Sequence, residues 1–380
     1  MADHRSEQAR STEDLAAYWS EQARRVDWIT KPRRALDDRT PHRWFLGATL
    51  NTCFNALDRH VVHGHGDRTA LVHDDVVTGC RASFTYVELL EGVAAFAGAL
   101  QGFGIGVGDR VLIQAAMIPE TVIAMLACAR IGAVHHVVPD GSAPHELAAR
   151  IDEARPKVVV TASCGVRPSG WVASLPVVHR ALEEADHQPE AVIVKQRPQR
   201  TVELHQPRDV DWDAAVRAGA TDPAGCVEVA ADAPLYVLHT ADPADEPERI
   251  VRDNGSHAVA MAWALPNLYD VHAGQVWWAA CDLASASGHS FAVYAPLFCG
   301  VTTVLHEGDA PGFPGPAAIS RVVAEHRVES LLVTDGTVVV LAEGDRGPDR
   351  LRRASERIGV PVHVSRWQTD SDWPFGTGAD

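Results

Sequence analysis

The sequence predicts an α/β fold built on stacked parallel sheets, and two observations support this. Short apolar runs typical of buried strands, such as Val111-Leu112-Ile113, alternate with segments of helical periodicity. The composition is 46% hydrophobic and 22% charged, which is ordinary for a globular protein and unlike a disordered one. Such alternation favours parallel pairing, because each helix returns the chain to where the next strand begins.

The first half of the chain supplies the clearest rhythm. Pro119 and Glu120 begin a helix and Gly132 ends it, since proline fits the first helical turn and glycine the position after the last. The other elements expected here are a helix over 86–100, strands over 111–113, 134–138 and 157–161, and a helix over 144–154.

The second half alternates in the same way after a polar stretch, 195–232, that we expect to be a weakly structured loop. The Arg-rich stretch 346–357 is interpreted as a solvated helix face. The elements expected between them are strands over 234–238, 276–280, 301–305 and 330–334 and helices over 255–270, 289–299 and 319–325. We divide the chain into an N-terminal helical extension (1–40), a first α/β subdomain (41–232) and a second one (233–380).

Charge and cysteine usage exclude some classes of protein. The net charge of −16 argues against nucleic acid and anionic membrane as partners, because the overall field repels both. No uninterrupted run of 18 apolar residues or signal-peptide pattern is present, so we expect no membrane span. The seven cysteines form no C-x-x-C pair, which indicates reduced, mostly buried thiols in a cytoplasmic protein.

Histidines are frequent, and two groups of them were considered as metal ligands. His60, His63 and His65 form H-x2-H-x-H, and His135 and His136 are adjacent. Zinc needs ligands that converge in space, which this spacing alone does not provide. We therefore assign no metal site from the sequence.

Five segments carry a more specific signal. They are WFLGATLNTCFNALDRH (44–60), GDRVLIQAAMIPETVIAMLACARIGAVH (108–135), VRDNGSHAVAMAW (251–263), HSFAVYAPLFCGVTTVLHEG (289–308) and RWQTDSDWP (366–374). In this order they resemble the acetyl- and propionyl-CoA synthetase branch of the adenylate-forming superfamily, the AMP-forming acyl-CoA synthetases. The resemblance implies a large domain of stacked α/β subdomains and a family that uses ATP, Mg²⁺ and CoA.

The resemblance also points to missing parts. The family's adenine loop has no counterpart between Thr337 and Val360, where roughly thirty residues or more are lacking by comparison with the family pattern. On this alignment the chain stops at Asp380, ahead of the family's small C-terminal domain with its catalytic lysine. We therefore expect that domain to be absent and the second subdomain to be a truncated AMP-binding domain.

The family's phosphate loop, Y-T-S-G-T-T-G-K-P-K-G, aligns without a gap on residues 239–249, yet only Thr240 and Pro247 match. Glycines let backbone N–H groups approach phosphate, and lysines supply charge. A carboxylate about 4 Å from a phosphate charge costs roughly 4 kcal/mol at an effective dielectric near 20. The replacements are Asp242, Asp245 and Arg249 for glycine, Glu246 and Glu248 for lysine, and Ala241, Pro243 and Ala244 for hydroxyl residues.

An acyl pocket follows from the resemblance. Ala286 and Ser287 would line it, and Trp367 would form a floor that leaves room only for a short acyl chain. The alternative interpretation is that Trp367 is an ordinary core residue.

Three more residues align with nucleotide, metal or CoA contacts of the family. Thr369 and Asp370 stand where the family has a Thr that meets the α-phosphate and a Glu that meets the metal, and Asp is one methylene shorter. Arg167 stands where the family contacts the CoA nucleotide. The alternative for Arg167 is an exposed loop arginine.

The function expected from these features is that of an acyl-CoA synthetase-like protein of the acetate/propionate–CoA ligase type that cannot form an acyl-adenylate alone. One alternative retains acyl or acyl-CoA binding, or a partial reaction with a partner protein. Another is a non-catalytic protein that pairs with an intact synthetase or with itself as a homo-oligomer.

Overall fold

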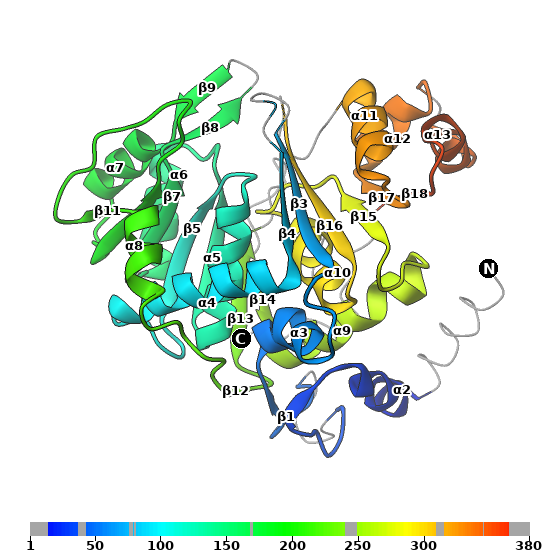
Figure 1. Cartoon of the computed structure of the whole chain (residues 1–380), viewed down its shortest axis with the longest axis horizontal. Helices are drawn as coiled ribbons and strands as arrows, with labels where there is room; N and C mark the ends of the chain where they lie inside the picture. The colour runs from blue at the N-terminus through cyan, green and yellow to red at the C-terminus, as the bar shows by residue number, and fades with distance from the viewer. Residues whose placement is uncertain are drawn as a thin grey trace.

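Two mainly parallel sheets organise the chain (Figure 1). The computed structural model describes residues 14–36, 43–75, 79, 81–167, 170–239, 249–308, 315–344 and 346–364. The predicted α/β class with stacked parallel sheets is confirmed.

The first sheet has seven strands in the order β11-β10-β7-β5-β6-β13-β14, parallel except for the β13–β14 pair. Four of them, β5, β6, β7 and β10, form its centre, and only the separate β8–β9 hairpin interrupts their succession along the chain. The strand bounds are β5 Arg110–Ala115, β6 Val134–Pro139, β7 Val158–Ala162, β10 Ala191–Lys195, β11 Asp209–Asp211, β13 Pro234–His239 and β14 Arg249–Asp253.

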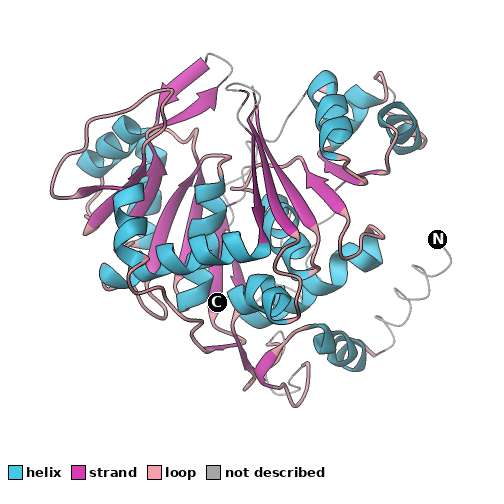
Figure 2. Cartoon of the chain, in the orientation of Figure 1, coloured by secondary structure: helices cyan, strands magenta, loops and turns pink. Residues whose placement is uncertain are grey.

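Helices cover both faces of the first sheet (Figure 2). Alternate residues of a strand point to opposite faces. Val111 and Ile113 of β5 therefore share a core with α4 and α5, whereas Leu112 faces α6 and α7. The helices are α4 Tyr86–Gly102, α5 Pro119–Ile131, α6 Pro144–Ala154, α7 Leu175–Glu184 and α8 Trp212–Gly219. Gly132 ends α5 with a left-handed φ of 73°, as its position in the sequence predicts.

The second sheet has six strands in the order β18-β17-β15-β16-β3-β4, parallel except for the β3–β4 pair. Its strands are β3 Thr69–Asp75, β4 Arg81–Thr85, β15 Val276–Ala279, β16 Thr302–Glu307, β17 Ser330–Val333 and β18 Val362–Val364. Its helices are α9 Asn254–Leu268, η3 Gly288–Tyr294, α10 Ala295–Phe298, α11 Pro316–His326, α12 Asp335–Leu341 and α13 Arg350–Ile358. The last three gather around β17 and β18 (Figure 1).

Each of the two sheets contains strands from both sides of the domain boundary expected at 232/233. β3 and β4 precede it and complete the second sheet, and β13 and β14 follow it and complete the first. The division into 41–232 and 233–380 thus does not follow sheet membership, and as a statement about domains it stays a prediction.

The expectation of a weakly structured loop over 195–232 is wrong. This stretch contains β11, α8 and the short strand β12 Val229–Ala230. Asp211 caps α8 by accepting a hydrogen bond from the backbone N–H of Ala214, and the Trp212 ring stacks on Phe96 of α4 at 3.9 Å. The local Asp211 cap and the distant aromatic partner both stabilise the helix, and the polar sequence around it conceals the second of these.

The N-terminal part packs against α9. It contains α2 Leu15–Gln22, η1 Ala23–Arg25, and β1 Trp28–Thr30 and β2 Thr49–Leu50, which join β12 in a three-stranded sheet; η2 Phe54–Asp58 and α3 Arg59–Val62 follow. The Trp19 and Trp263 rings meet edge to face at 5.5 Å, and Trp263 Nε1 donates to the Tyr18 hydroxyl over 2.8 Å. None of the helices in the described residues is long and apolar enough to cross a membrane.

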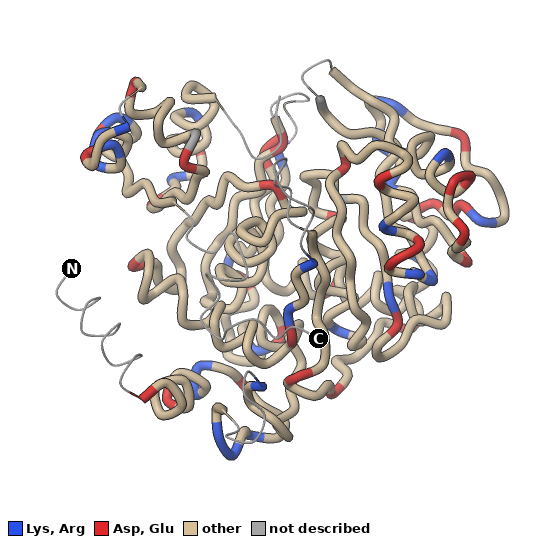
Figure 3. The backbone as a smooth tube through the Cα atoms, turned by 180° about the vertical axis from the view of Figure 1, so that it is seen from behind, with Lys and Arg blue, Asp and Glu red and all other residues tan. Residues whose placement is uncertain are grey.

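Basic and acidic residues are interspersed along the chain (Figure 3). The Arg-rich stretch illustrates this, because α13 buries Ala354 and exposes Arg352, Arg353 and Arg357. Arg352 pairs with Glu356 over 2.6 Å. The interpretation of this stretch as a solvated helix face is confirmed.

Candidate functional site

The segments singled out from the sequence follow the carboxyl ends of parallel strands. In open parallel sheets, ligands bind outside these ends. Residues 240–248 follow β13, Ala286 and Ser287 follow β15, residues 334–337 follow β17, residues 365–380 follow β18, and Arg167 ends β8 Cys164–Arg167, the strand after β7. In chain order, these segments thus come after strands of the first sheet, strands of the second sheet and the separate strand β8.

Arg197 joins the carboxyl edge of the first sheet to that of the second. It lies just after β10 and binds Glu307, the last residue of β16, through two hydrogen bonds of 2.7 and 2.5 Å. Its Nη2 also lies 3.6 Å from an oxygen of Asp75, the last residue of β3. Burial alone would lower the pKa of Arg197, but its bonds to Glu307 raise it. The guanidinium therefore remains charged between the two sheets.

The substituted phosphate loop connects two antiparallel strands at the edge of the first sheet. His239 ends β13 opposite Arg249, which begins β14. Both approach one carboxylate, since Glu153 on α6 lies 3.0 Å from His239 Nε2 and 3.7 Å from Arg249 Nε. Although burial opposes it, contact with His239 and Arg150 lowers the pKa of Glu153, which stays ionised. This adds negative charge beside a loop already rich in acids.

Of the loop residues predicted from the sequence, the structure describes Arg249. Its side chain is 58% exposed at the start of β14. The remaining ones, Thr240, Ala241, Asp242, Asp245, Glu246 and Glu248, lie outside the described residues.

Ala286 and Ser287 begin the helical segment that continues into η3, directly after a compact turn over residues 282–285. The Asp282 carbonyl accepts from the Ser285 N–H over 3.0 Å, and the Ser285 hydroxyl accepts from the Gly288 N–H over 3.0 Å. A Cβ on Gly288 would lie 1.8 Å from the Asp282 carbonyl oxygen, so only glycine fits there. Ser287 is buried and Ala286 packs against the main core. The turn thus holds both residues in fixed places.

The other predicted contacts are not brought together by described side chains. Trp367, Thr369 and Asp370 lie outside the described residues. The backbone of Arg167 pairs with Gly170 in the β8–β9 hairpin (β9 Gly170–Ala173), and its side chain is outside the description. Their roles remain predictions.

A buried cluster of histidine and tyrosine between the two sheets was not predicted. His135 Nε2 and the Tyr294 hydroxyl are 3.1 Å apart, and the His135 and His289 rings are nearly parallel at 5.6 Å. Burial lowers the pKa of His289 to about 3 and that of His135 well below its usual value. Both rings are therefore neutral and contribute packing and hydrogen bonds. The motifs contained these residues, but spacing alone could not show that they meet.

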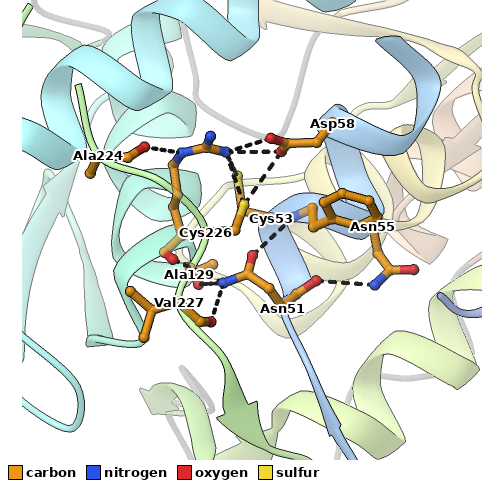
Figure 4. A network of polar contacts seen from close by, with 10 residues as sticks. Asn51, Cys53, Asn55, Asp58, Ala129, Ala224, Cys226 and Val227 are labelled. Atoms are coloured by element: carbon orange, nitrogen blue, oxygen red, sulfur yellow. Dashed lines mark hydrogen bonds and ion pairs between the residues drawn. The ribbon is translucent and has the colours of Figure 1, made fainter. Parts of the chain in front are cut away.

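A second arginine network lies near the N-terminal segment (Figure 4). Arg130 on α5 binds Asp58 through Nη1 over 2.8 Å and donates from Nε to the Ala224 carbonyl over 2.6 Å. The same Nη1 contacts the thiols of Cys226 at 3.1 Å and Cys53 at 3.6 Å. The network ties α5 to η2 and to the approach to β12, and it stabilises the fold at a distance from the predicted site segments.

Comparisons with known proteins agree with this architecture. The family model of AMP-binding enzymes matches residues 58–360, and that of the acetyl-coenzyme A synthetase N-terminus matches residues 4–56. The human mitochondrial acyl-CoA synthetase short-chain family member 3 is 40% identical over 91% of this chain and 51% of its own length. An acetyl-coenzyme A synthetase of Yersinia pseudotuberculosis is 34% identical over 94% of this chain and 56% of its own.

An uncharacterized protein of Pseudomonas aeruginosa is 43% identical over 96% of this chain and 62% of its own length. The chain thus spans about half to three fifths of the length of these curated relatives. The order of motifs, the paired parallel sheets and the extent of the match lead to one conclusion: the chain belongs to the AMP-binding enzyme family, with homologues among the short-chain acyl-CoA synthetases.

Proposed function

We propose that this chain is an acyl-CoA synthetase-like protein of the acetate/propionate type that does not form an acyl-adenylate by itself. The observation that carries this proposal is the sequence of residues 239–249, where acids replace both lysines and two of the three glycines of the family's loop. The loop connects His239, the last residue of β13, to Arg249, the first residue of β14, and ligands of open parallel sheets bind outside the carboxyl ends of strands, which supports the proposal.

Electrostatics supports the same proposal. The loop carries Asp242, Asp245, Glu246 and Glu248 against one arginine, and the ionised Glu153 lies beside its two ends. At roughly 4 kcal/mol for each close pair of like charges, two such pairs cancel the binding free energy of an ordinary micromolar nucleotide site, about 8 kcal/mol. ATP–Mg²⁺ would therefore not bind in the family's usual pose.

The test is ATP–pyrophosphate exchange with acetate and with propionate, and the purified chain should give none. A matched variant carries Y-T-S-G-T-T-G-K-P-K-G at residues 239–249, and calorimetry should detect ATP binding to it but not to the natural chain. Exchange catalysed by the natural chain would refute the proposal. Absence of ATP binding to the restored variant would show that the loop is not the cause.

A second candidate function is binding of a short acyl group or its CoA thioester, without adenylation. The compact turn before Ala286 and buried Ser287 favours it, because its hydrogen bonds hold this part of the predicted acyl pocket in place. Calorimetry with propionyl-CoA, with CoA as the matched control, should show saturable binding that is tighter for the thioester. No saturable heat with either compound would leave only a role in protein–protein interaction.

We also place the protein in a reducing compartment, in line with the cytoplasmic location expected from the sequence. All six cysteines in the described residues are free, and four of them are buried. Fractionation of the native cells, with thiol titration of the recovered chain, tests this placement; recovery of a disulfide-linked form would contradict it.

A further inference from the structure

Two histidines and an aspartate converge outside the site described above. His179 lies on α7, Asp209 begins β11, and His205 lies in the connection that precedes β11. His179 Nε2 is 2.7 Å from Asp209 Oδ2, and the two imidazole rings stack at 4.1 Å with an interplanar angle of 20°. A potential ligand atom of each residue lies within 4.8 Å of those of the other two.

The carboxylate of this cluster is held ionised. The Asp209 side chain is fully buried, and its Oδ2 accepts the backbone N–H of His205 over 2.8 Å. Arg208 Nε binds the other oxygen, Oδ1, over 3.1 Å. Burial opposes ionisation, but these bonds and the one from His179 lower the pKa of Asp209 overall. One oxygen thus carries the contact to arginine, while the other faces the imidazoles.

The cluster opens onto solvent through a pocket of about 420 Å³. His179 and His205 both line it, together with the carboxylates Glu183 and Glu203. Glu183 follows His179 by one helical turn, so the two lie on the same face of α7. A small cation can enter from solvent, past two acids, Glu183 and Glu203, and one basic residue, Arg180.

A second group of potential ligands serves as the comparison. Asp74, Glu325 and His326 also bring their ligand atoms close together. Arg321 binds both carboxylates of that group, and Arg81 approaches them as well, so its negative charge is already neutralised by protein cations. The His179 cluster differs because it offers two imidazoles, of which His205 is exposed, and because arginine contacts its carboxylate through one oxygen, Oδ1.

We propose that His179, His205 and Asp209 bind one Zn²⁺ ion, with the fourth position left to water or a pocket carboxylate. Imidazole and carboxylate are zinc's ordinary ligands, at about 2.0–2.2 Å in tetrahedral geometry. Ligand atoms of such a site are roughly 3.3 Å apart. The His179 and Asp209 atoms therefore need to separate by about half an ångström. The exposed His205 ring must also turn out of its stack on His179, because imidazole binds a metal in the plane of its ring. Bound metal would clamp α7 to the connection before the edge strand β11.

The proposal is tested by calorimetric titration of metal-stripped full chain with ZnCl₂, and by Co²⁺ absorption as a probe of coordination. We expect one saturable equivalent and the visible bands of tetrahedral Co²⁺. His179→Ala and His205→Ala should each lose the saturable step. His272→Ala should retain it; this is the matched control, because His272 forms an exposed pair with Asp270 at 3.0 Å outside the cluster.

Binding by imidazole requires its unprotonated form, so affinity should also fall when the titration is repeated at pH 5. Circular dichroism checks that the variants fold, and the exposed His205 makes His205→Ala the safer of the two. Absence of a saturable equivalent would overturn the proposal, and so would full Zn²⁺ affinity in the folded His205→Ala variant.

Discussion

The Arg197 and Arg130 networks both bury a guanidinium, but they compensate its charge differently. Arg197 has the carboxylates of Glu307 and Asp75, whose side chains are 3% and 2% exposed. Arg130 has one carboxylate, Asp58, which is 16% exposed, and completes its contacts with a carbonyl and two thiols. The Arg197 guanidinium is thus neutralised by two buried carboxylates between the sheets. The Arg130 guanidinium is bound by one partly exposed carboxylate and by neutral groups. Removal of a partner should therefore cost more at Arg197.

The largest expected effect is that of Glu307→Ala. Loss of one partner of a buried ion pair leaves a charge without compensation, which costs about 3–5 kcal/mol. Because Asp75 stays near Arg197, we expect a loss at the lower end of this range. The free energy of unfolding in urea should fall by about 3 kcal/mol. Glu307→Gln keeps an acceptor oxygen without charge and should lose less. Equal stability of the wild type and Glu307→Ala would show that the two sheets do not depend on this contact.

The next largest effect on stability is expected from the ionisation of Asp253. At this carboxylate, burial outweighs the hydrogen bonds to Ser256. Burial raises its pKa from 3.8 to about 6, although it caps α9 through Ser256. A raised pKa means that the folded state holds the proton more tightly. This contribution to stability is complete below pH 3.8 and is lost as the pH rises through about 6. The shift corresponds to roughly 3 kcal/mol.

Asp253→Asn isolates this contribution, because the amide cannot ionise and still accepts the Ser256 N–H. The stability of the variant relative to the wild type should rise between pH 4 and pH 7.5, measured by urea unfolding at each pH. A difference that does not change with pH would mean that Asp253 titrates alike in the folded and unfolded chain.

Asp58→Asn should cost less than Glu307→Ala, and this sharpens the comparison. Arg130 would lose its one carboxylate but keep the Ala224 carbonyl. A buried hydrogen-bonded group deprived of a partner typically costs about 1–3 kcal/mol. Thermal and urea unfolding of both variants side by side give the ranking. A larger loss of stability in Asp58→Asn than in Glu307→Ala would contradict the expectation that fully buried carboxylates contribute more to stability than partly exposed ones.

The sequence predicted those parts of the fold whose cause is local. The helix 119–131 follows from Pro119 and Gly132, and the central strands from their apolar runs. Contacts between distant residues were missed, as with Trp212 on Phe96 and with Arg197 and Glu307, which are 110 positions apart. The polar local sequence predicted a loop here. The structure instead has a helix and an ion pair, each of which depends on a partner distant in the sequence.

The same limit applies to the candidate site. Its segments could be placed after particular strands, because topology follows from the order of strands and helices, and the described parts of Arg249, Ala286 and Ser287 lie there. The meeting of His135 with His289 could not be derived, since it depends on how two sheets pack. The convergence of His179 on His205 and Asp209 depends in turn on a connection that looked unstructured.

The smallest effect is expected on α13, where the ion pair is on the surface. Arg352 and Glu356 are 2.6 Å apart with side chains 59% and 61% exposed. Water and salt screen the attraction between such side chains, and the conformational entropy lost in ordering them offsets the remainder. Glu356→Gln should leave the urea midpoint unchanged at 0.15 M salt. A clear decrease of the urea midpoint in Glu356→Gln would imply that contact distance decides how much an ion pair stabilises the fold. An unchanged midpoint, together with a loss of stability in Glu307→Ala, would imply that burial decides it.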